Sequence, residues 1–262
     1  LNLLRARTGR FSCTSPNIQQ IPSRDPELGT LCRSIFVPEK GDKWYSLDFS
    51  NQEGRLQVHY AYKLGCEGAA ELKMEFDANP NLDMHQKVAN LVGIERTPAK
   101  VINLGISYGM GIGKLAKALG LKEGQAKIIR DKYNDLAPFL AQLNDKCKET
   151  LADKGYIRTI GGRRSALDAP MFEDGKKRTF EYKALNKLIQ GSAADQTIEA
   201  MIWAYKEGIP VTFPVHDQLC MSGTREQAKR LQHIMEHAIE LDIPSVCDVD
   251  LDGGDSWATA GH

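Results

Sequence analysis

The stretch KWYSLDFSNQEGR, residues 43–55, passes from a strand pattern to a helix pattern. Aromatic and apolar side chains dominate its first half, and neither Gly nor Pro interrupts Lys43–Asn51, which predicts a β-strand. Asp48 lies inside that strand, and burying a carboxylate among apolar groups is costly unless a cation compensates its charge. Asp48 is therefore the first candidate for chemistry. An Asp at the exposed end of the strand, capping a helix that starts at about Gln52, fits the same pattern.

A second stretch, VTFPVHDQLCM at residues 211–221, favours a functional role for Asp48 over a capping role. Two apolar runs flank His216 and Asp217, which predicts a tight hairpin with a charged tip. An Asp on such a tip is often only a turn former. Together with Asp48, however, it suggests two carboxylates that converge from two strands onto metal. Mg²⁺ prefers oxygen ligands, and a pair of such ions can serve the attacking and leaving oxygens of a phosphoryl transfer.

Composition limits the other function classes. The 262 residues carry 34 Lys+Arg against 34 Asp+Glu, so no overall basic field indicates a nucleic-acid partner. No apolar run approaches the ~20 residues of a membrane span, and no signal peptide is visible. The six cysteines are scattered without a metal-binding spacing, which is typical of reduced thiols in a cytoplasmic protein. Because the chain starts at Leu1 and a motif is under way by residue 9, we expect a fragment of a longer protein.

The sharpest local signal is RTPAKVINLGISYGMG at 96–111. Thr97 as N-cap and Pro98 as first helical residue predict where a helix begins. Four residues recur at every fourth position and share one stripe of this helix: Arg96, Lys100, Leu104 and Tyr108. Two cations at a helix N-terminus would hold a triphosphate, and the residues further along would offer a surface for a base. The alternative is a surface helix with two solvated cations.

Other polar residues stand in recognisable local contexts. Residues 9–22 form an ordered loop rich in groups that hydrogen-bond nucleic acids. Glu53 lies in the first turn of its helix, where the helix dipole favours a negative charge. His85 follows a plausible N-cap, Asp83, and a lone His there is more often a surface residue than a ligand. The remaining predicted elements are strands at Leu31–Val37 and Val246–Leu251, helices at 81–95, Lys122–Tyr133, Pro138–Ala152, Glu181–Lys206 and Arg225–Leu241, and a hairpin of Tyr156–Ile160 with Ser165–Leu167. Within the long helix Asn186, Gln190 and Asp195 require polar partners.

Five motifs in one order make the chain resemble the palm and fingers of family A DNA polymerases, the group that includes bacterial DNA polymerase I and several phage enzymes. The motifs are TGRFSCTSPNIQQIP at 8–22, DFSNQEGR at 48–55, RTPAKVINLGISYG at 96–109, NKLIQGSAAD at 186–195 and VHDQ at 215–218. The resemblance implies an α+β fold, a right-hand architecture without its thumb, in which a helical fingers subdomain is inserted into an antiparallel-sheet palm. The expected division is palm at 1–60 and 154–262, and fingers at 61–153.

The resemblance also implies roles for individual residues. Asp48, Asp217 and the carbonyl of Phe49 would bind two Mg²⁺ ions, for which Mn²⁺ can substitute. Arg96, Lys100 and His85 would hold the triphosphate, and Lys100 would also protonate the pyrophosphate. Tyr108 would stack near the new base pair, and Glu53 would exclude ribonucleotides. Leu104 and Gln52 would line the nucleotide site, and Arg10, Asn17, Gln19, Asn186, Gln190 and His216 would contact the primer-template.

Three of these positions depart from the family pattern. Gln218 stands where a Glu is usual, and because that Glu is not expected to be an essential ligand, we expect activity to survive. Leu104 stands where Phe or Tyr is usual, which bears on sugar discrimination and incorporation speed. Gln52 replaces an apolar residue beside the sugar gate.

The expected activity is DNA-templated DNA synthesis, with primer-template DNA and dNTPs as partners. We expect a monomer without a membrane partner, in the cytoplasm of a bacterial or phage-infected cell, with an organelle as the alternative; a thumb and proofreading or 5′ nuclease domains would lie upstream. The enzymatic rival is a single-subunit RNA polymerase, which Glu53 disfavours because its carboxylate suits deoxyribose. The non-enzymatic rival is a primer-template binding module that has lost its activity, which the retention of both aspartates disfavours.

Overall fold

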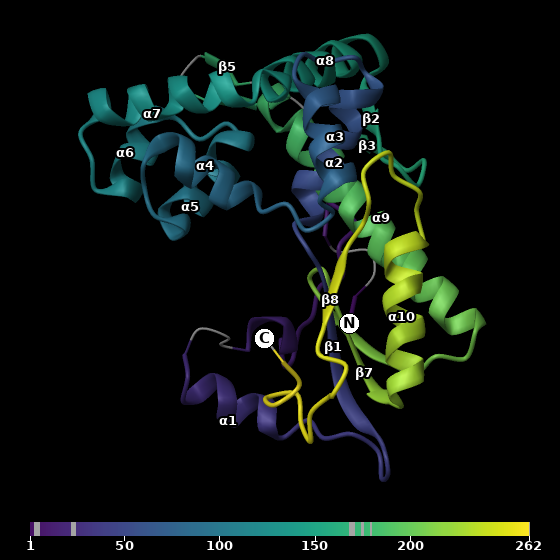
Figure 1. Cartoon of the computed structure of the whole chain (residues 1–262). Helices are drawn as coiled ribbons and strands as arrows, with labels where there is room; N and C mark the ends of the chain where they lie inside the picture. The colour runs from purple at the N-terminus through teal and green to yellow at the C-terminus, as the bar shows by residue number, and fades with distance from the viewer. Residues whose placement is uncertain (3–5, 22–24, 168–170, 174–175, 179, 262) are drawn as a thin grey trace. The chain divides into compact units, whose positions relative to one another are not determined.

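The computed structural model describes residues 1–2, 6–21, 25–167, 171–173, 176–178 and 180–261, and they divide into two units (Figure 1). Unit 1 consists of Leu1–Glu53, Thr159–Arg163 and Gln190–His262, and unit 2 of Gly54–Arg158 and Arg164–Ile189. These bounds differ from the expected division, because 54–60, 154–158 and 164–189 belong to the helical unit. The assignment of palm and fingers to the units stays a prediction.

An antiparallel sheet of four strands forms the centre of unit 1, in the order β6-β7-β1-β8. The bounds are β1 Lys43–Phe49, β6 Val211–Val215, β7 Gln218–Gly223 and β8 Cys247–Val249. β1 is central, and its residue Asp48 lies opposite Gln218 of β7 and Asp248 of β8. The pairing of β6 with β7 shifts register between Val211 and Phe213. The α+β fold class is thereby confirmed.

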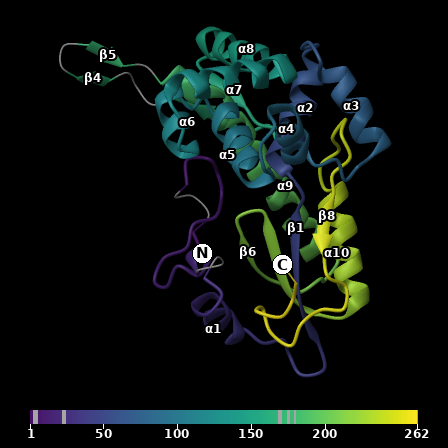
Figure 2. The ribbon, with the colours of Figure 1, turned by 60° about the vertical axis from the view of Figure 1, so that its left-hand side comes forward.

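The two faces of this sheet bury different side chains, because successive residues of a strand point to opposite sides. Tyr45, Leu47 and Phe49 pack with apolar residues of α9 (Ala184–Lys206) and α10 (Arg225–His237). Figure 2 shows α10 alongside β8 and β1. Trp44, on the other face, packs with Phe213 and Trp257 and is followed in the same alternation by Ser46 and Asp48. Asp48 therefore lies on the face opposite the α9–α10 core.

Unit 2 is mainly helical. Its elements are α2 (Gln52–Lys63, which starts in unit 1), α3 (Ala69–Ala78), α4 (Met84–Val92), α5 (Arg96–Ser107), α6 (Ile112–Leu119), α7 (Glu123–Leu136), α8 (Pro138–Lys154), the hairpins β2 (Tyr156–Arg158) with β3 (Arg164–Ala166) and β4 (Met171–Glu173) with β5 (Lys176–Arg178), and the short helix η2 (Glu181–Lys183). Phe76, Leu115, Tyr133 and Leu143 are among its fully buried side chains. In the described part of the chain, no helix combines the length and apolarity needed to cross a bilayer.

Several predicted elements are confirmed. The strand around Asp48 passes into α2 at Gln52, Asp83 caps α4, and a hairpin turns at His216 and Asp217. The helices α7 and α8, the β2–β3 hairpin and the long helix α9 also match their predicted positions, with η2 preceding α9.

The predicted strand at Leu31–Val37 is wrong, because Leu28–Ser34 forms the helix α1. Asp25 accounts for the difference: its carboxylate accepts the backbone N–H groups of Glu27 and Leu28 at 3.0 and 2.8 Å, and so satisfies donors at the helix start. Most of the apolar run stays at the surface, since Leu31 is 64% exposed and Ile35 73%, and Phe36 is the residue that packs against the core of Trp44, Phe213 and Trp257. A strand signal read from apolar residues alone assumes that they are buried.

Three elements also have ends that differ from the prediction. α5 begins at Arg96 with Glu95 as its N-cap, before the predicted Thr97 and Pro98. α10 ends at His237, where the next residue becomes its C-cap, and β8 keeps only Cys247–Val249. A short connecting helix, η1 (Ile18–Gln20), lies within the N-terminal loop. End residues depend on local hydrogen bonds that periodicity does not specify.

Candidate active site

Two carboxylates lie at the same end of paired strands in unit 1. Asp48 is the next-to-last residue of β1, and Asp217 belongs to the turn between β6 and β7. The N–H of Phe49 donates to the carbonyl oxygen of Asp217 at 3.4 Å, which fixes the turn beside the end of β1. Both aspartates are half-buried. His216, the residue before Asp217, is exposed and has φ +58°.

The strand register adds two polar neighbours to Asp48. Gln218 and Asp248 lie directly opposite it on β7 and β8, so the three side chains belong to one face of the sheet. Carboxylates are the oxygen donors that hard cations bind. Over the described residues, no group of three or more His, Cys, Asp or Glu side chains is arranged to hold a metal ion. A metal bound here would draw on two carboxylates together with backbone or substrate oxygens.

Glu53 and Arg10 form an ion pair near Asp217. The guanidinium of Arg10 donates to the carboxylate of Glu53 at 2.5 Å, and the two side chains are 29% and 20% exposed. Burial raises the pKa of Glu53, the guanidinium of Arg10 opposes this effect, and the charge of Asp217 adds to it. The structure thus brings Arg10, Glu53 and Asp217 into one electrostatic neighbourhood within unit 1.

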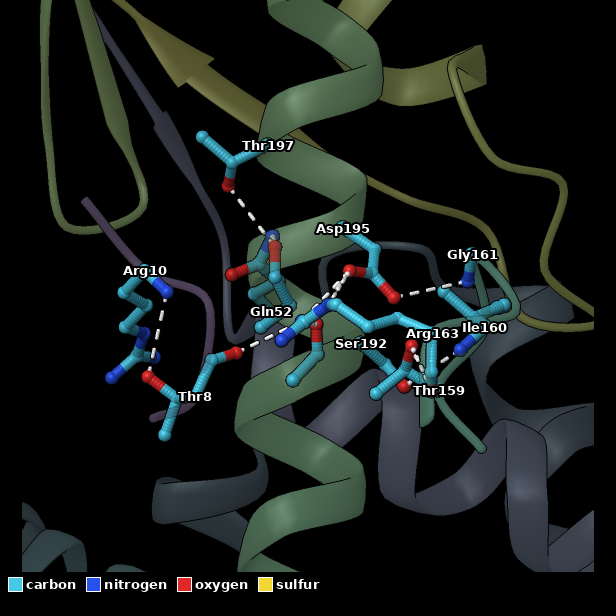
Figure 3. Close-up of polar contacts among 12 residues, drawn as sticks. Thr8, Arg10, Gln52, Thr159, Ile160, Gly161, Arg163, Ser192, Asp195 and Thr197 are labelled. Carbon is cyan, nitrogen blue, oxygen red and sulfur yellow. Dashed lines mark hydrogen bonds and ion pairs between the residues drawn. The ribbon is translucent and has the colours of Figure 1, made fainter. Parts of the chain in front are cut away.

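A buried polar network holds this part of unit 1 on α9 (Figure 3). Asp195 is 8% exposed at its side chain and accepts hydrogen bonds from Nε and a terminal nitrogen of Arg163 at 3.1 and 2.8 Å, and from the N–H of Gly161 at 3.0 Å. Arg163 also donates to the carbonyl oxygens of Thr8 and Gly191, both at 2.9 Å. One guanidinium therefore joins the 159–163 turn, α9 and the segment that carries Arg10.

Only one side of this network, Asp195, could be anticipated from the sequence. Asp195 was expected to need a polar partner because of its place in a long apolar helix, but nothing in the spacing pointed to Arg163. Thr159 and Ser192 add to the contact: the N–H of Thr159 bonds the carbonyl of Arg163, and Ser192 accepts the N–H of Ile160 at 3.1 Å.

The structure shows the hydrogen bonds or burial of four residues of unit 1 that were predicted to bind substrates. Gln52 is 4% exposed, and its amide donates to the carbonyl of Ala193 and to Gln196. Asn17 caps η1, and Gln19 donates to the carbonyl of Pro214 at 3.4 Å. Gln190 is half-buried on α9. Their contacts with nucleotide or primer-template stay predictions.

The predicted triphosphate-binding residues in unit 2 come from two adjacent helices. Asp83 caps α4 through the N–H groups of His85 and Gln86 at 2.9 and 3.0 Å, and its other oxygen accepts Nε of Arg96 at 2.6 Å. The starts of α4 and α5 are thereby tied together. Lys100, one turn along α5, is exposed. The groups of His85, Arg96 and Lys100 thus share one electrostatic neighbourhood with the carboxylate of Asp83.

His85 itself is part of a hydrogen-bonded chain. Nδ2 of Asn103 lies 3.0 Å from Nδ1 of His85, and the hydroxyl of Tyr133 donates to Oδ1 of Asn103 at 2.7 Å. Burial lowers the pKa of His85; the charge of Asp83 opposes this, whereas Lys100 and Arg96 lower the pKa further. Asn103 and Tyr133 were not among the predicted site residues, since neither carries a charge or a motif signal.

Tyr108 and Asn186 line one cavity of unit 2. Its volume is about 200 Å³, and Ser107, Asn134 and Tyr182 also line it. Oδ1 of Asn186 is buried and has no hydrogen-bond partner among the described residues. Leu104 belongs to α5, but its side chain lies outside what the structure describes. The cavity therefore joins one residue predicted to stack on a base with one predicted to contact DNA.

Comparison with known proteins gives a consistent result. The family model described as DNA polymerase family A matches residues 1–259. A DNA-directed DNA polymerase of Pseudomonas phage M6 is 35% identical, and the match covers 98% of this chain and 44% of the phage protein. DNA polymerase I of Bacillus subtilis is 32% identical, and the match covers 99% of this chain and 31% of the bacterial protein. The solved POL domain of Pol1 from M. smegmatis, in complex with DNA primer-template and dNTP, has a TM-score of 0.81 and 28% identity over 100% of this chain and 48% of that one. The chain thus spans less than half the length of these relatives. Its sequence and fold together place it in DNA polymerase family A.

Proposed function

We propose that the chain carries the catalytic centre of a DNA-templated DNA polymerase, which adds a deoxynucleotide to a primer 3′-hydroxyl and releases pyrophosphate. The observation that carries the proposal is the strand register, which sets Asp48 and Asp217 at one end of β1 and β7 with Glu53 and Arg10 beside them. The similarity to a POL domain bound to primer-template and dNTP supports the same activity. Primer-template DNA and dNTPs are the proposed partners. The proposed setting is a bacterial or phage-infected cell.

The two half-buried carboxylates have the donor chemistry that Mg²⁺ requires. Two Mg²⁺ or Mn²⁺ ions, bound by Asp48, Asp217 and the carbonyl of Phe49, would supply positive charge to the attacking and leaving oxygens. The nucleotidyl transfer itself would involve the primer, water and Lys100. The primer 3′-oxygen bonds the α-phosphorus while the bond to the bridging oxygen breaks, the hydroxyl proton passes to water, and the ammonium of Lys100 gives a proton to the pyrophosphate.

Nucleotide binding is proposed for unit 2, which would serve as the fingers, and unit 1 would serve as the palm. Arg96 and Lys100 would hold the triphosphate at the start of α5, where exposed N–H groups also attract anions. In the free protein Arg96 pairs with Asp83, so the triphosphate would take the place of that carboxylate. Breaking this exposed ion pair would cost little free energy, since such surface pairs contribute about 0–1 kcal/mol.

Glu53 is the proposed sugar gate, with Gln52 beside it as a support. The pair of Glu53 with Arg10 holds the carboxylate in one place, and the bonds of Gln52 to α9 anchor the start of α2. A fixed carboxylate would exclude a 2′-hydroxyl by steric contact. A single-subunit RNA polymerase, the enzymatic rival, would instead need room for that hydroxyl.

Single-nucleotide extension of a labelled primer-template in Mg²⁺, comparing dNTP with rNTP, tests the proposal. Wild type should add dNTPs in preference to rNTPs, and Asp48→Asn and Asp217→Asn should each lose at least about a hundredfold in rate, because each removes a charged ligand. Asp255→Asn is the matched control, since Asp255 is exposed and pairs with Lys43. Undiminished synthesis by Asp48→Asn would remove this aspartate from the mechanism. Magnesium-independent DNA binding with no extension by wild type would favour a non-catalytic binding module.

A further inference from the structure

Three side chains from three helices of unit 2 form one hydrogen-bonded chain that ends on His85. Tyr133 of α7 is 1% exposed and its hydroxyl donates to Oδ1 of Asn103 on α5 at 2.7 Å. Nδ2 of the same amide lies 3.0 Å from Nδ1 of His85 on α4. Burial raises the pKa of Tyr133 far above its usual value, so its hydroxyl remains a donor at any working pH.

The direction of this chain follows from what each group can donate. A buried hydroxyl proton needs an acceptor, and the only acceptor of the Asn103 side chain is Oδ1. With Oδ1 turned to Tyr133, the NH₂ group faces His85 and can only donate. Nδ1 of His85 must then accept, which requires it to carry no proton. The hydrogen bond that one ring nitrogen makes decides where the proton of the imidazole sits.

We propose that Asn103 is a positioning residue that holds His85 as a neutral imidazole with its proton on Nε2. Arg96 and Lys100 then supply charge to a triphosphate, while His85 supplies one directional N–H that does not depend on pH near neutrality. The identity of the phosphate ligand rests on the proposed function; the state of the imidazole does not.

Of the charged groups around His85, two favour the neutral imidazole and one opposes it. Lys100 and Arg96 of α5 disfavour a charged imidazole, and Asp83 before α4 favours it. Asp83 already pairs with Arg96, which leaves less of its charge for His85. Protonation would also place an N–H on Nδ1 against the NH₂ of Asn103. Turning that amide over would relieve the clash only by taking the acceptor away from the Tyr133 hydroxyl.

Nitrogen NMR of ¹⁵N-histidine-labelled protein tests the proposal without any substrate. The His85 signals are assigned by their loss in His85→Gln. In wild type, Nδ1 should give the shift of an unprotonated nitrogen and Nε2 that of a protonated one, from pH 6 to 8. Asn103→Asp should reverse this tautomer and raise the pKa of His85, because an isosteric carboxylate accepts from both neighbours. Asn90→Asp adds the same charge at an exposed position of α4 and should leave His85 unchanged.

Kinetics give a second and separate measurement. For Asn103→Asp, KM for dNTP should rise about tenfold at high pH, where the neutral ring offers a lone pair to the phosphate, and fall again as His85 becomes protonated; a lost hydrogen bond to a charged group is of that size. Wild-type KM should be flat over the same range. A protonated Nδ1 in the wild-type spectrum would overturn the proposal, whether or not the protein polymerises. The expected spectra with an inactive protein would instead count against the proposed function alone.

Discussion

Replacement of Arg163 by Ala should destabilise unit 1 by about 2–3 kcal/mol. The change removes the guanidinium that pairs with Asp195 and bonds the carbonyls of Thr8 and Gly191. Asp195 would keep the N–H of Gly161 but lose its cation at a site where its side chain is only 8% exposed. Removing one member of a fully buried pair costs about 3–5 kcal/mol. Arg163 is 35% exposed, so water reaches part of the gap and the lower figure follows.

Urea unfolding followed by tryptophan fluorescence measures this change. All three tryptophans belong to unit 1, and two of them, Trp44 and Trp257, are 3% and 4% exposed, so their signal reports that unit. Arg163→Lys should lie between wild type and Arg163→Ala, because an ammonium keeps the charge but cannot reproduce the fork of donors.

Arg164→Ala is the matched control. Arg164 is the next residue and also an arginine, but it is exposed, stacks on Tyr156 at 4.7 Å and belongs to unit 2, so unfolding of both variants is followed by circular dichroism as well as by fluorescence. Its loss should cost less than about 1 kcal/mol. If Arg163→Ala and Arg164→Ala cost the same, or if Arg163→Ala costs under about 1 kcal/mol, the network is not the support inferred from its geometry.

Two further outcomes are expected. Asp83→Asn should lower the free energy of unfolding by less than about 1 kcal/mol in urea unfolding followed by circular dichroism, because Asn still caps α4 and the change removes the exposed ion pair with Arg96. Asp83→Ala, which also removes the cap, should lower it by about 1 kcal/mol more. Equal losses for the two variants would show that capping is not what Asp83 contributes. Burial raises the pKa of Cys147 and of Cys220 to about 12, so at pH 8 both stay protonated and unreactive. A colorimetric thiol reagent should therefore react quickly in the native protein with half-buried Cys32, and Cys32→Ser should abolish that phase; a fast phase that survives this change would contradict the burial.

Local signals predicted the elements that carry the aspartates. An uninterrupted apolar run followed by polar residues located β1 and α2, and two short runs around His216 located the β6–β7 hairpin. The partners of these elements could not be predicted in the same way. The register that sets Asp248 opposite Asp48 joins residues from opposite ends of the chain, and Asp195 meets Arg163 from a turn 32 residues earlier. Such pairings depend on how elements pack, which periodicity does not contain.

In the candidate site, too, the sequence did not reveal which residues hold the predicted binding groups in place. Resemblance singled out residues with charges or motif positions, such as His85 and Arg96. It passed over Asn103 and Tyr133, which act on His85 only through contact. It also assigned Gln52 to the nucleotide, although the amide is engaged on α9 in the free protein. Sequence reasoning finds groups that can bind; the structure is needed to find those that hold them.

The outer strands of the unit 1 sheet bear on how the protein behaves at high concentration. β6 and β8 are the two edges, and an open edge is a template on which another chain can add a strand. β6 contains Pro214, which has no N–H to offer, and its register shift bends the edge. β8 is only three residues long and exposes Asp248 at its middle. Both edges therefore discourage intermolecular pairing, so the sheet should resist amyloid-like association even when the protein is concentrated.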